Sequence, residues 1–233
     1  MIETSEGLDK KLSLHYYARM RFVANLLPQL TKASNNEATE DKTPSLSRVI
    51  SVLDAGGEAP LNLTDLPLKT HYSLKNCAQH AITMNSLAME HLASAASHPQ
   101  TSFVHSFPGI VRTRLARGLG SVTRLAVNAL MVLTKPWEVS LEESGERHLY
   151  AATSPRFAPG AQASGTGVSR TDDVAEGSDG RLGSGFYRLA ADGETFAPSR
   201  VLQQYREDGT REMVWKHTKH TVDLFASVRD ERS

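Results

Sequence analysis

The sequence predicts an α/β fold with a short parallel sheet, extended towards the C-terminus by a hairpin and a helix. Two short runs, Arg48–Leu53 and Ser102–Phe107, have the composition of strands, and we expect a third strand at Glu146–Ala152. Segments with helical character separate them, and the longest of these opens at Tyr72. Strands that alternate with helices imply parallel pairing through right-handed crossovers. We therefore expect the three runs to share one sheet.

The segment from Tyr72 to Ala95 carries the clearest helical pattern in the chain. Its apolar residues recur at spacings of three and four, which places them on one face of an amphipathic helix. The sequence Ser97-His98-Pro99 ends the pattern, because proline cannot continue a helix. The apolar positions after the opening tyrosine are Leu74, Ala78, Ala81, Met84, Ala88, Leu92 and Ala95.

Two further helices are expected on either side of the first two strand runs. Ser13–Leu30 places tyrosine, methionine and leucine side chains on one face, and the polar stretch Thr31–Leu46 after it indicates a loop. Ser121 is a suitable N-cap for a helix that reaches Thr134. Pro136-Trp137 ends that helix.

The C-terminal third changes character. Ser154–Gly185 is rich in Gly, Ser, Ala and Asp, which is typical of a long, mobile loop. Asp192-Gly193 then predicts a hairpin turn between Phe186–Leu189 and Thr195-Phe196. Helix is expected over Ser199–Arg206 and Thr210–Val228. We accordingly divide the chain into a core (1–153), a flexible loop (154–185) and a C-terminal hairpin and helix (186–233).

Composition excludes several classes of protein. The 233 residues contain 26 Lys and Arg and 26 Asp and Glu, so the net charge is zero. A neutral chain without a basic block argues against nucleic acid as a partner. No apolar run reaches the roughly 18 residues of a membrane span. Cys77 is the only cysteine, which suits a reducing compartment, and we expect a cytoplasmic protein.

The order and spacing of these motifs resemble the C-terminal half of a short-chain dehydrogenase/reductase. A strand, Arg48-Val-Ile-Ser-Val-Leu, precedes a tyrosine at the mouth of a helix. A second strand ends in Pro108-Gly-Ile-Val-Arg-Thr113, and Gly145-Glu-Arg-His-Leu-Tyr resembles the last core strand of the family. The resemblance runs from about Leu12 to the C-terminus and is greatest to a branch common in filamentous fungi. It implies a truncated, three-layered, Rossmann-like fold.

The resemblance also implies a set of catalytic positions. Tyr72 matches the family's proton-transferring tyrosine, and Asn76 stands where the family has a lysine that lowers the tyrosine pKa. Asp54 falls near the family's substrate-binding serine, and His15 near its helix asparagine. Asn76 offers hydrogen bonds but no positive charge. Read without the resemblance, Tyr72 is an interfacial tyrosine, Asp54 a turn former and His15 a partly buried polar residue.

The cofactor implied by the resemblance is NAD(P). Pro108, Gly109, Val111 and Thr113 match the family's loop on the nicotinamide side. The glycine-rich turn that binds pyrophosphate at a helix N-terminus has no counterpart in this sequence. We therefore expect the N-terminal, dinucleotide-binding half of the family to be absent and free NAD(P) to bind weakly. No pattern of ligands predicts a metal site.

Three functions remain open at this point. The resemblance implies an oxidoreductase that acts on a small hydrophobic carbonyl or alcohol, plausibly in secondary metabolism. A non-redox isomerase or cyclase could reuse the same cleft, with Tyr72, His15 or Asp54 moving protons. A non-catalytic remnant is the third alternative. In each case an unpaired edge at Arg48–Leu53 predicts a homodimer or another partner that covers it.

Overall fold

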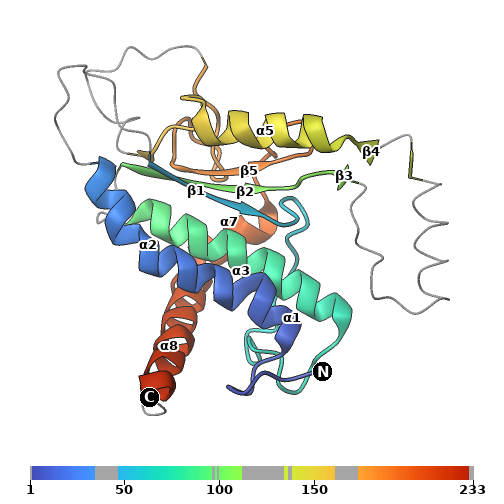
Figure 1. Cartoon of the computed structure of the whole chain (residues 1–233), viewed down its shortest axis with the longest axis vertical. Coiled ribbons are helices and arrows are strands. Elements are labelled where there is room, and N and C mark those ends of the chain that lie inside the picture. Colours follow the sequence, from blue (N-terminus) through green and yellow to red (C-terminus); the bar gives the residue numbers. More distant parts are fainter. Residues whose placement is uncertain are drawn as a thin grey trace.

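The structure, a computed structural model, describes residues 2–34, 47–95, 98, 100–111, 134–135, 138–160 and 173–230. It has three layers (Figure 1). A small sheet lies in the middle, α5 (Leu141–Thr153) covers one face, and α2 (Ala18–Ser34) and α3 (Leu74–Ser94) cover the other. This is the α/β architecture with a short parallel sheet that the sequence predicts.

The central sheet has three parallel strands in the order β1-β2-β5. They are β1 (Ser47–Val52), β2 (Thr101–Ser106) and β5 (Phe186–Leu189). The register places Val49 beside Phe103, and Phe103 beside Phe186. Both β2 and β5 are buried along their whole length, as expected for parallel strands covered on both faces. Because all three strands run the same way, their carboxyl ends meet at one edge.

The third predicted strand is wrong. Glu146–Ala152 lies inside helix α5, and the strand that completes the sheet is β5. Ser140 caps the helix by accepting a hydrogen bond from Glu143 N, and Glu142 and Glu143 stand in the first turn. An N-cap serine followed by acidic residues stabilises a helix start through hydrogen bonding and the helix dipole.

Two hydrophobic clusters hold the layers together. The larger one fills the space between the sheet and helices α2 and α3, and Tyr16, Met84, Leu87 and Phe103 lie fully buried in it. The smaller one joins the sheet to α5 and consists of Val104, Ala151, Phe157, Ala175, Tyr187 and Leu189. The sheet is therefore covered on both sides, in agreement with its apolar strands.

The first helix contains an irregular turn. It begins as α1 (Lys10–Leu12), widens into a π-helix, η1 (Ser13–Tyr17), and continues as α2. The side chains of Tyr16 and Tyr17 are both buried. The helix predicted over Ser13–Leu30 is thus present, with a longer span and one wide turn.

The C-terminal segments pack across the helices of the larger cluster. Helices α7 (Arg200–Glu207) and α8 (Thr210–Asp230) match the predicted helices, and Gly209 joins them with a φ of +79°. The hydroxyl of Tyr17 lies 2.8 Å from His217 Nε2 on α8. The predicted hairpin turn is also present, because Leu189 and Thr195 form an antiparallel bridge around Gly193.

The remaining predicted segments are described in part. Residues 173–185 form turns that return to the core, where Ala175 N donates to Arg156 O at 2.9 Å. A short second sheet pairs β3 (Ile110–Val111) with β4 (Glu138–Val139). The predicted helix Ser121–Thr134, apart from its last residue, and most of the predicted loop Thr31–Leu46 lie outside the described residues. The division of the chain at 153 and 185 stays a prediction.

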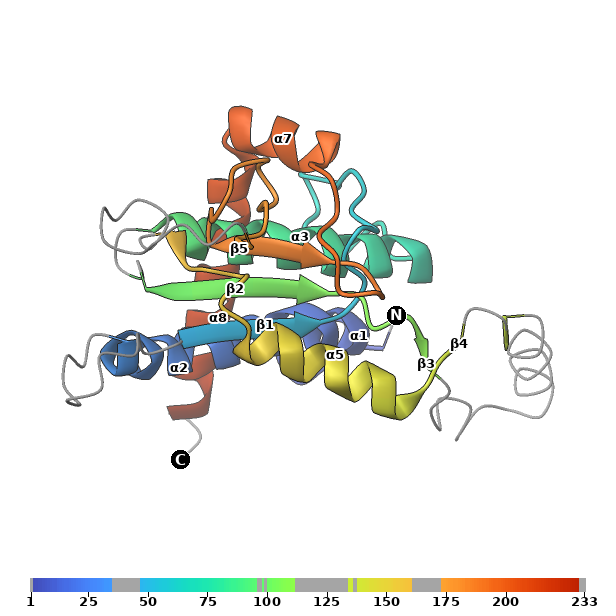
Figure 2. The same ribbon diagram turned by 90° about the horizontal axis from the view of Figure 1, so that it is seen from above.

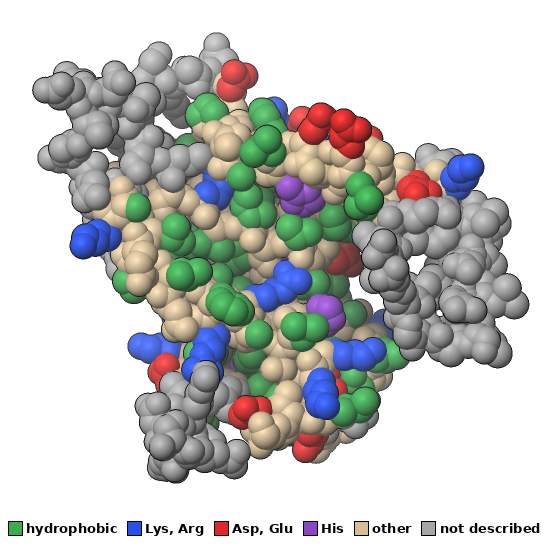
Figure 3. All heavy atoms as spheres, viewed as in Figure 1, with side chains coloured by type: hydrophobic (Ala, Val, Ile, Leu, Met, Phe, Trp, Pro, Cys, Tyr) green, Lys and Arg blue, Asp and Glu red, His purple; other side chains and the backbone are tan. Residues whose placement is uncertain are grey.

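The free edge of β1 faces outward in the described part of the chain. Figure 2 shows β1 as the outermost strand, and Figure 3, which looks at this side, shows hydrophobic side chains across the middle of the face. Val52 is 37% exposed, and Val49 and Ile50 are partly exposed. An apolar edge strand is a template for pairing with another chain.

We expect this edge to cause association of the isolated chain at micromolar concentration. Light scattering coupled to size-exclusion chromatography should give a mass above 25.5 kDa. Val52→Glu places a charge on the edge and should shift the protein towards monomer, because an edge charge opposes strand pairing. A monodisperse monomer of the unaltered chain, melting cooperatively, would contradict this expectation.

Candidate functional site

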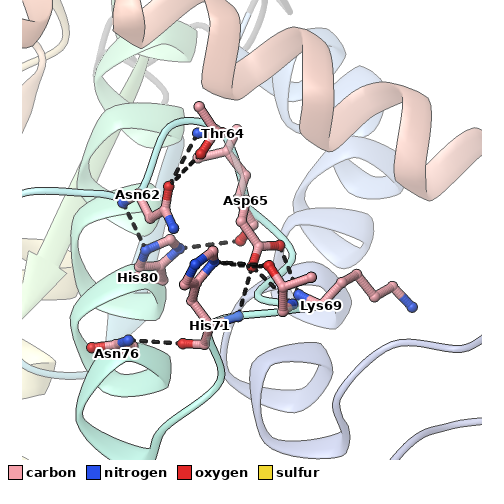
Figure 4. Close-up of polar contacts among 9 residues, drawn as sticks. Asn62, Thr64, Asp65, Lys69, His71, Asn76 and His80 are labelled. Carbon is pink, nitrogen blue, oxygen red and sulfur yellow. Dashed lines mark hydrogen bonds and ion pairs between the residues drawn. The ribbon is translucent and has the colours of Figure 1, made fainter.

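The loop between β1 and α3, residues 53–73, leads to Tyr72 and is organised by one buried carboxylate. Asp65 Oδ1 accepts a hydrogen bond from Lys69 N at 2.7 Å, and Oδ2 accepts from the backbone nitrogens of Thr70 and His71 at 2.9 Å each. The hydroxyl of Thr70 and the ring of His71 also contact Oδ2 (Figure 4). This single side chain therefore fixes the path of the backbone into the helix.

Hydrogen bonds also set the protonation state of Asp65. Burial alone would raise the pKa of its carboxyl, but the side chain and backbone of Thr70 and the backbones of His71 and Lys69 donate to it. Together these hydrogen bonds hold the pKa of Asp65 well below its ordinary value. Asp65 is therefore ionised at neutral pH even though its residue is only 7% exposed.

A second set of contacts fastens the loop to α3. His80 Nε2 accepts from Asn62 N at 3.0 Å, so its Nδ1 carries the hydrogen that bonds Leu66 O at 3.1 Å. Thr83 Oγ1 accepts from Ala59 N at 2.9 Å and donates to the carbonyl of the same residue at 2.8 Å. The loop is thus held against the helix along its length.

Tyr72 lies at the end of this loop, just before the N-cap Ser73. It packs against the larger cluster and remains partly exposed. Desolvation, the negative charge of Asp9 and hydrogen bonds with Asp9 and Cys77 raise the pKa of Tyr72. The hydroxyl is therefore a neutral phenol at physiological pH and holds a proton that it could give away.

Asn76 makes a structural contact. Its Nδ2 donates to His71 O at 2.8 Å (Figure 4). Its backbone nitrogen donates to the capping hydroxyl of Ser73 at 3.0 Å. Both bonds tie the loop to the first turn of α3. Asn76 therefore supports the conformation at Tyr72 without supplying a charge to its phenol.

Asp54 and His15 have different polar neighbours from Tyr72. Asp54 follows β1, and burial together with the charge of Glu58 raises its pKa. His15 lies in η1, where burial and then the charges of Arg19 and Lys11 lower its pKa. Its Nδ1 is buried without a hydrogen-bond partner. Arg19, whose charge acts on His15, donates to Ser51 Oγ at 3.1 Å and to Val52 O at 2.6 Å in β1.

The predicted cofactor loop follows β2. Pro108 and Gly109 form its turn, and Val111 belongs to β3. Gly109 has a φ of +79°, and a Cβ there would lie 2.8 Å from a methyl of Val139 and 3.1 Å from Ala191. Glycine is needed at this turn for close packing of the backbone. Thr113 lies outside the described residues.

A buried polar cluster of Glu58, Ser86, His105 and Arg188 was not predicted from the sequence. Glu58 and Arg188 form an ion pair at 2.9 Å, with side chains 1% and 2% exposed. Ser86 Oγ donates to Glu58 Oε1 at 2.7 Å and lies 2.7 Å from His105 Nδ1. Buried charges of this kind require partners, and Arg188, a charged residue between Tyr187 and Leu189 in a strand-like run, is the feature of the sequence from which the cluster could have been suspected.

Desolvation lowers the pKa of His105 to about 4, opposed by the charge of Glu58 and assisted by Arg188 and Arg19. Because the pKa of a histidine in an unfolded chain is about 6.5, His105 binds a proton more readily in the unfolded chain than in the folded one. His105 therefore contributes stability above pH 6.5 that is lost as the pH falls towards 4.

No family model matches the chain. An oxidoreductase of Emericella nidulans, AN1596, is 40% identical over 224 residues, which cover 95% of this chain and 63% of the relative. The short-chain dehydrogenase/reductase SAT2 of Stachybotrys chartarum is 29% identical over 229 residues, covering 96% of this chain and 61% of the relative. The chain is thus similar to fungal oxidoreductases, one of which is named as a short-chain dehydrogenase/reductase.

The names of these relatives agree with the resemblance found in the motifs. The chain spans 63% and 61% of the lengths of these two curated relatives. A solved carbonyl reductase from chicken fatty liver, bound to NADPH, covers 84% of the chain and is covered over 61% of its own length. At a TM-score of 0.39 and 17% identity, that likeness carries no weight.

A membrane-spanning helix and a metal-binding cluster are both absent from the described residues. None of the described helices is long and apolar enough to cross a membrane. Within the same residues, no three His, Cys, Asp or Glu side chains are grouped so as to hold a metal ion.

Asp65→Asn should destabilise the fold by roughly 2 kcal/mol at neutral pH, because a charged acceptor of several hydrogen bonds is lost. The folded pKa of Asp65 is depressed, so its contribution is present above pH 4 and is lost as the pH falls further. Urea melts from pH 7 to pH 2 should show that the variant and the unaltered chain differ less in free energy of unfolding as the pH falls below 4. The exposed Asp223→Asn serves as the control, and a difference that does not vary with pH would contradict the assignment.

Proposed function

We propose that the chain forms the substrate-binding and proton-transferring part of an oxidoreductase that acts on a small hydrophobic carbonyl or alcohol in fungal secondary metabolism. The observation that carries this proposal is Tyr72, a family tyrosine held at the mouth of α3 by an ordered loop. The relatives named as oxidoreductases support the reaction class. The substrate is a small molecule bound near the carboxyl ends of the strands.

The state of the phenol favours reduction over oxidation. Oxidation of an alcohol needs a base, and lowering the phenol pKa towards neutrality requires a nearby cation. Here the neighbour of Tyr72 is a carboxylate, Asp9, and the pKa of the Tyr72 phenol is raised. A neutral phenol can give its proton to the oxygen of a carbonyl as negative charge develops there. Tyr72 would therefore act as the acid in the reduction of a carbonyl.

The family relationship implies NAD(P) as the source of hydride, but the described residues fit this cofactor only in part. Pro108, Gly109 and Val111 supply a turn at the carboxyl end of β2. The space beside Gly109 is filled by Val139 and Ala191, which leaves no cradle for a phosphate there. In the described ranges, no strand passes directly through a glycine-rich turn into a helix. A pyrophosphate site would have to come from outside these residues.

Tyr72→Phe should lower the rate of any carbonyl reduction at least about 100-fold, because general acid catalysis contributes a factor of that size or more. The substitution keeps the aromatic ring in the cluster and should leave the melting temperature nearly unchanged. The measurement is the rate at which a panel of aromatic and aliphatic ketones is consumed, with NADPH supplied in excess. Full activity in this variant would show that Tyr72 is structural.

Asn76→Lys keeps the phenol of Tyr72 and adds a positive charge near it. A cation one turn from Tyr72 should lower the phenol pKa, and the ultraviolet absorbance of tyrosinate would report the shift. Asn76→Gln is the matched polar control without charge. Turnover that needs no nicotinamide would instead favour the isomerase or cyclase, in which Asp54 and His15 move protons.

Free NAD(P) should bind this chain weakly or not at all. The physical reason is the lack of a helix N-terminus after a glycine-rich turn in the described residues, where phosphate is normally bound. Isothermal titration of NADPH and NADH at 25 °C is the measurement. A micromolar or tighter dissociation constant would contradict the expectation and would place a phosphate site in the residues not described.

A further inference from the structure

We propose that Ser106 and His148 form a nucleophile–base pair that cleaves O-acetyl esters at a site distinct from Tyr72. Ser106 is the last residue of β2, and His148 lies in the middle of α5. Helix α5 and Tyr72 lie on opposite sides of the sheet, since Tyr72 precedes α3 (Figure 1). The pair thus stands apart from the oxidoreductase site and does not depend on that proposal.

The orientation of His148 is fixed by its other nitrogen. Nδ1 lies 2.6 Å from Ser144 O, a backbone carbonyl that can only accept, so Nδ1 carries the hydrogen. Nε2 of the neutral ring is then an acceptor, and Ser106 Oγ lies 3.3 Å from it. A hydroxyl that faces a base, with the base oriented by a third group, is the arrangement of an activated nucleophile, which is often looser without substrate.

The surroundings of the pair determine which acyl group fits. A narrow crevice at Ser106 and His148, bounded by Phe107, Pro108 and Leu189, leaves about 10 Å³ of room, close to the space of one water molecule. A wider hollow of about 340 Å³ adjoins it, and Arg147 and Gly193 line both. This narrow space has no room for a long acyl chain, so acetyl, a small acyl group, suits it better, while the alcohol part of the ester lies in the wider hollow.

The wider hollow is lined mostly by charged residues, which suits an alcohol with several hydroxyl groups. It is lined by Glu146, Arg147, Tyr150, Arg156, Asp192, Gly193 and Glu194. Arg147 donates to Ala191 O and pairs with Glu143, which fixes its guanidinium at the junction of the two spaces. Its positive charge there would stabilise the negative charge that develops on the ester carbonyl oxygen.

The reaction uses only the ester and water. Ser106 Oγ forms a bond to the carbonyl carbon while its proton moves to His148 Nε2. The bond between that carbon and the alcohol oxygen breaks, and the alcohol leaves with the proton from Nε2. Water then attacks the acetyl-serine, gives a proton to Nε2, and releases acetate as Ser106 recovers its hydrogen. No oxidation or reduction takes place.

A second serine–histidine pair in the same chain provides an internal comparison. Ser86 Oγ lies only 2.7 Å from His105 Nδ1, but Ser86 and His105 are both completely buried. The hydroxyl of Ser86 is also bound to Glu58. Ser106 is itself only 5% exposed, but unlike Ser86 it lines the crevice, so of these two serines we expect the ester to acetylate Ser106, although Ser86 has the shorter hydrogen bond.

The test uses the whole folded chain with p-nitrophenyl acetate and p-nitrophenyl octanoate, without nicotinamide. We expect hydrolysis of the acetate at a rate above that of the urea-unfolded chain, and at least tenfold faster than the octanoate. Ser106→Ala and His148→Gln should each lower the rate at least about 100-fold. Acid quenching followed by peptide mass spectrometry should find acetyl on Ser106.

The exposed Ser94→Ala is the control and should keep the full rate, and circular dichroism melts establish that each variant folds. An unchanged rate in Ser106→Ala would overturn the proposal, as would an octanoate rate equal to the acetate rate. A folded chain no faster than the unfolded one, or acetyl on Ser86, would overturn it equally.

Discussion

The buried ion pair of Glu58 and Arg188 is the constraint on which the other parts of the structure depend. Both side chains are almost completely removed from water, and removing one partner would leave an uncompensated charge at a cost of about 3–5 kcal/mol. Glu58 belongs to the loop after β1, and Arg188 to β5. Ser86 and His105 extend the contact to α3 and β2. The loop that carries Tyr72 is therefore connected to the sheet as well as to its own helix.

Local patterns were sufficient to predict the elements that have a strong period or composition. The helix after Tyr72 and the strands around Val49 and Phe103 were found from residues within each segment, and α8 likewise. The strand predicted at Glu146–Ala152 was assigned from the resemblance of Gly145-Glu-Arg-His-Leu-Tyr to a family strand, and the structure has helix there. The signal that decides its helical state lies upstream, in the cap Ser140.

The candidate site was harder to predict than the fold. The family pattern led to Tyr72, Asn76, Asp54 and His15, but sequence spacing could not give their polar neighbours. Asp9 beside Tyr72 and Arg19 beside Ser51 come from distant parts of the chain. Glu58 and Arg188 are 130 residues apart, and Ser106 and His148 are 42 apart. Such pairs follow from tertiary packing and leave no period in the sequence.

The wide turn at Ser13–Tyr17 has a consequence for insertions and deletions in this region. An α-helix turns about 100° per residue, and a π turn accommodates one extra residue without changing the direction of the helix that follows. This is how two consecutive tyrosines, Tyr16 and Tyr17, both reach the interior while Leu14 stays 65% exposed. A relative that lacks one residue here could keep α2 unchanged and form a regular helix. It would then present only one aromatic side chain to the core. A single gap in an alignment at this point would therefore indicate that the hydrophobic core beneath the helix is packed differently in that relative.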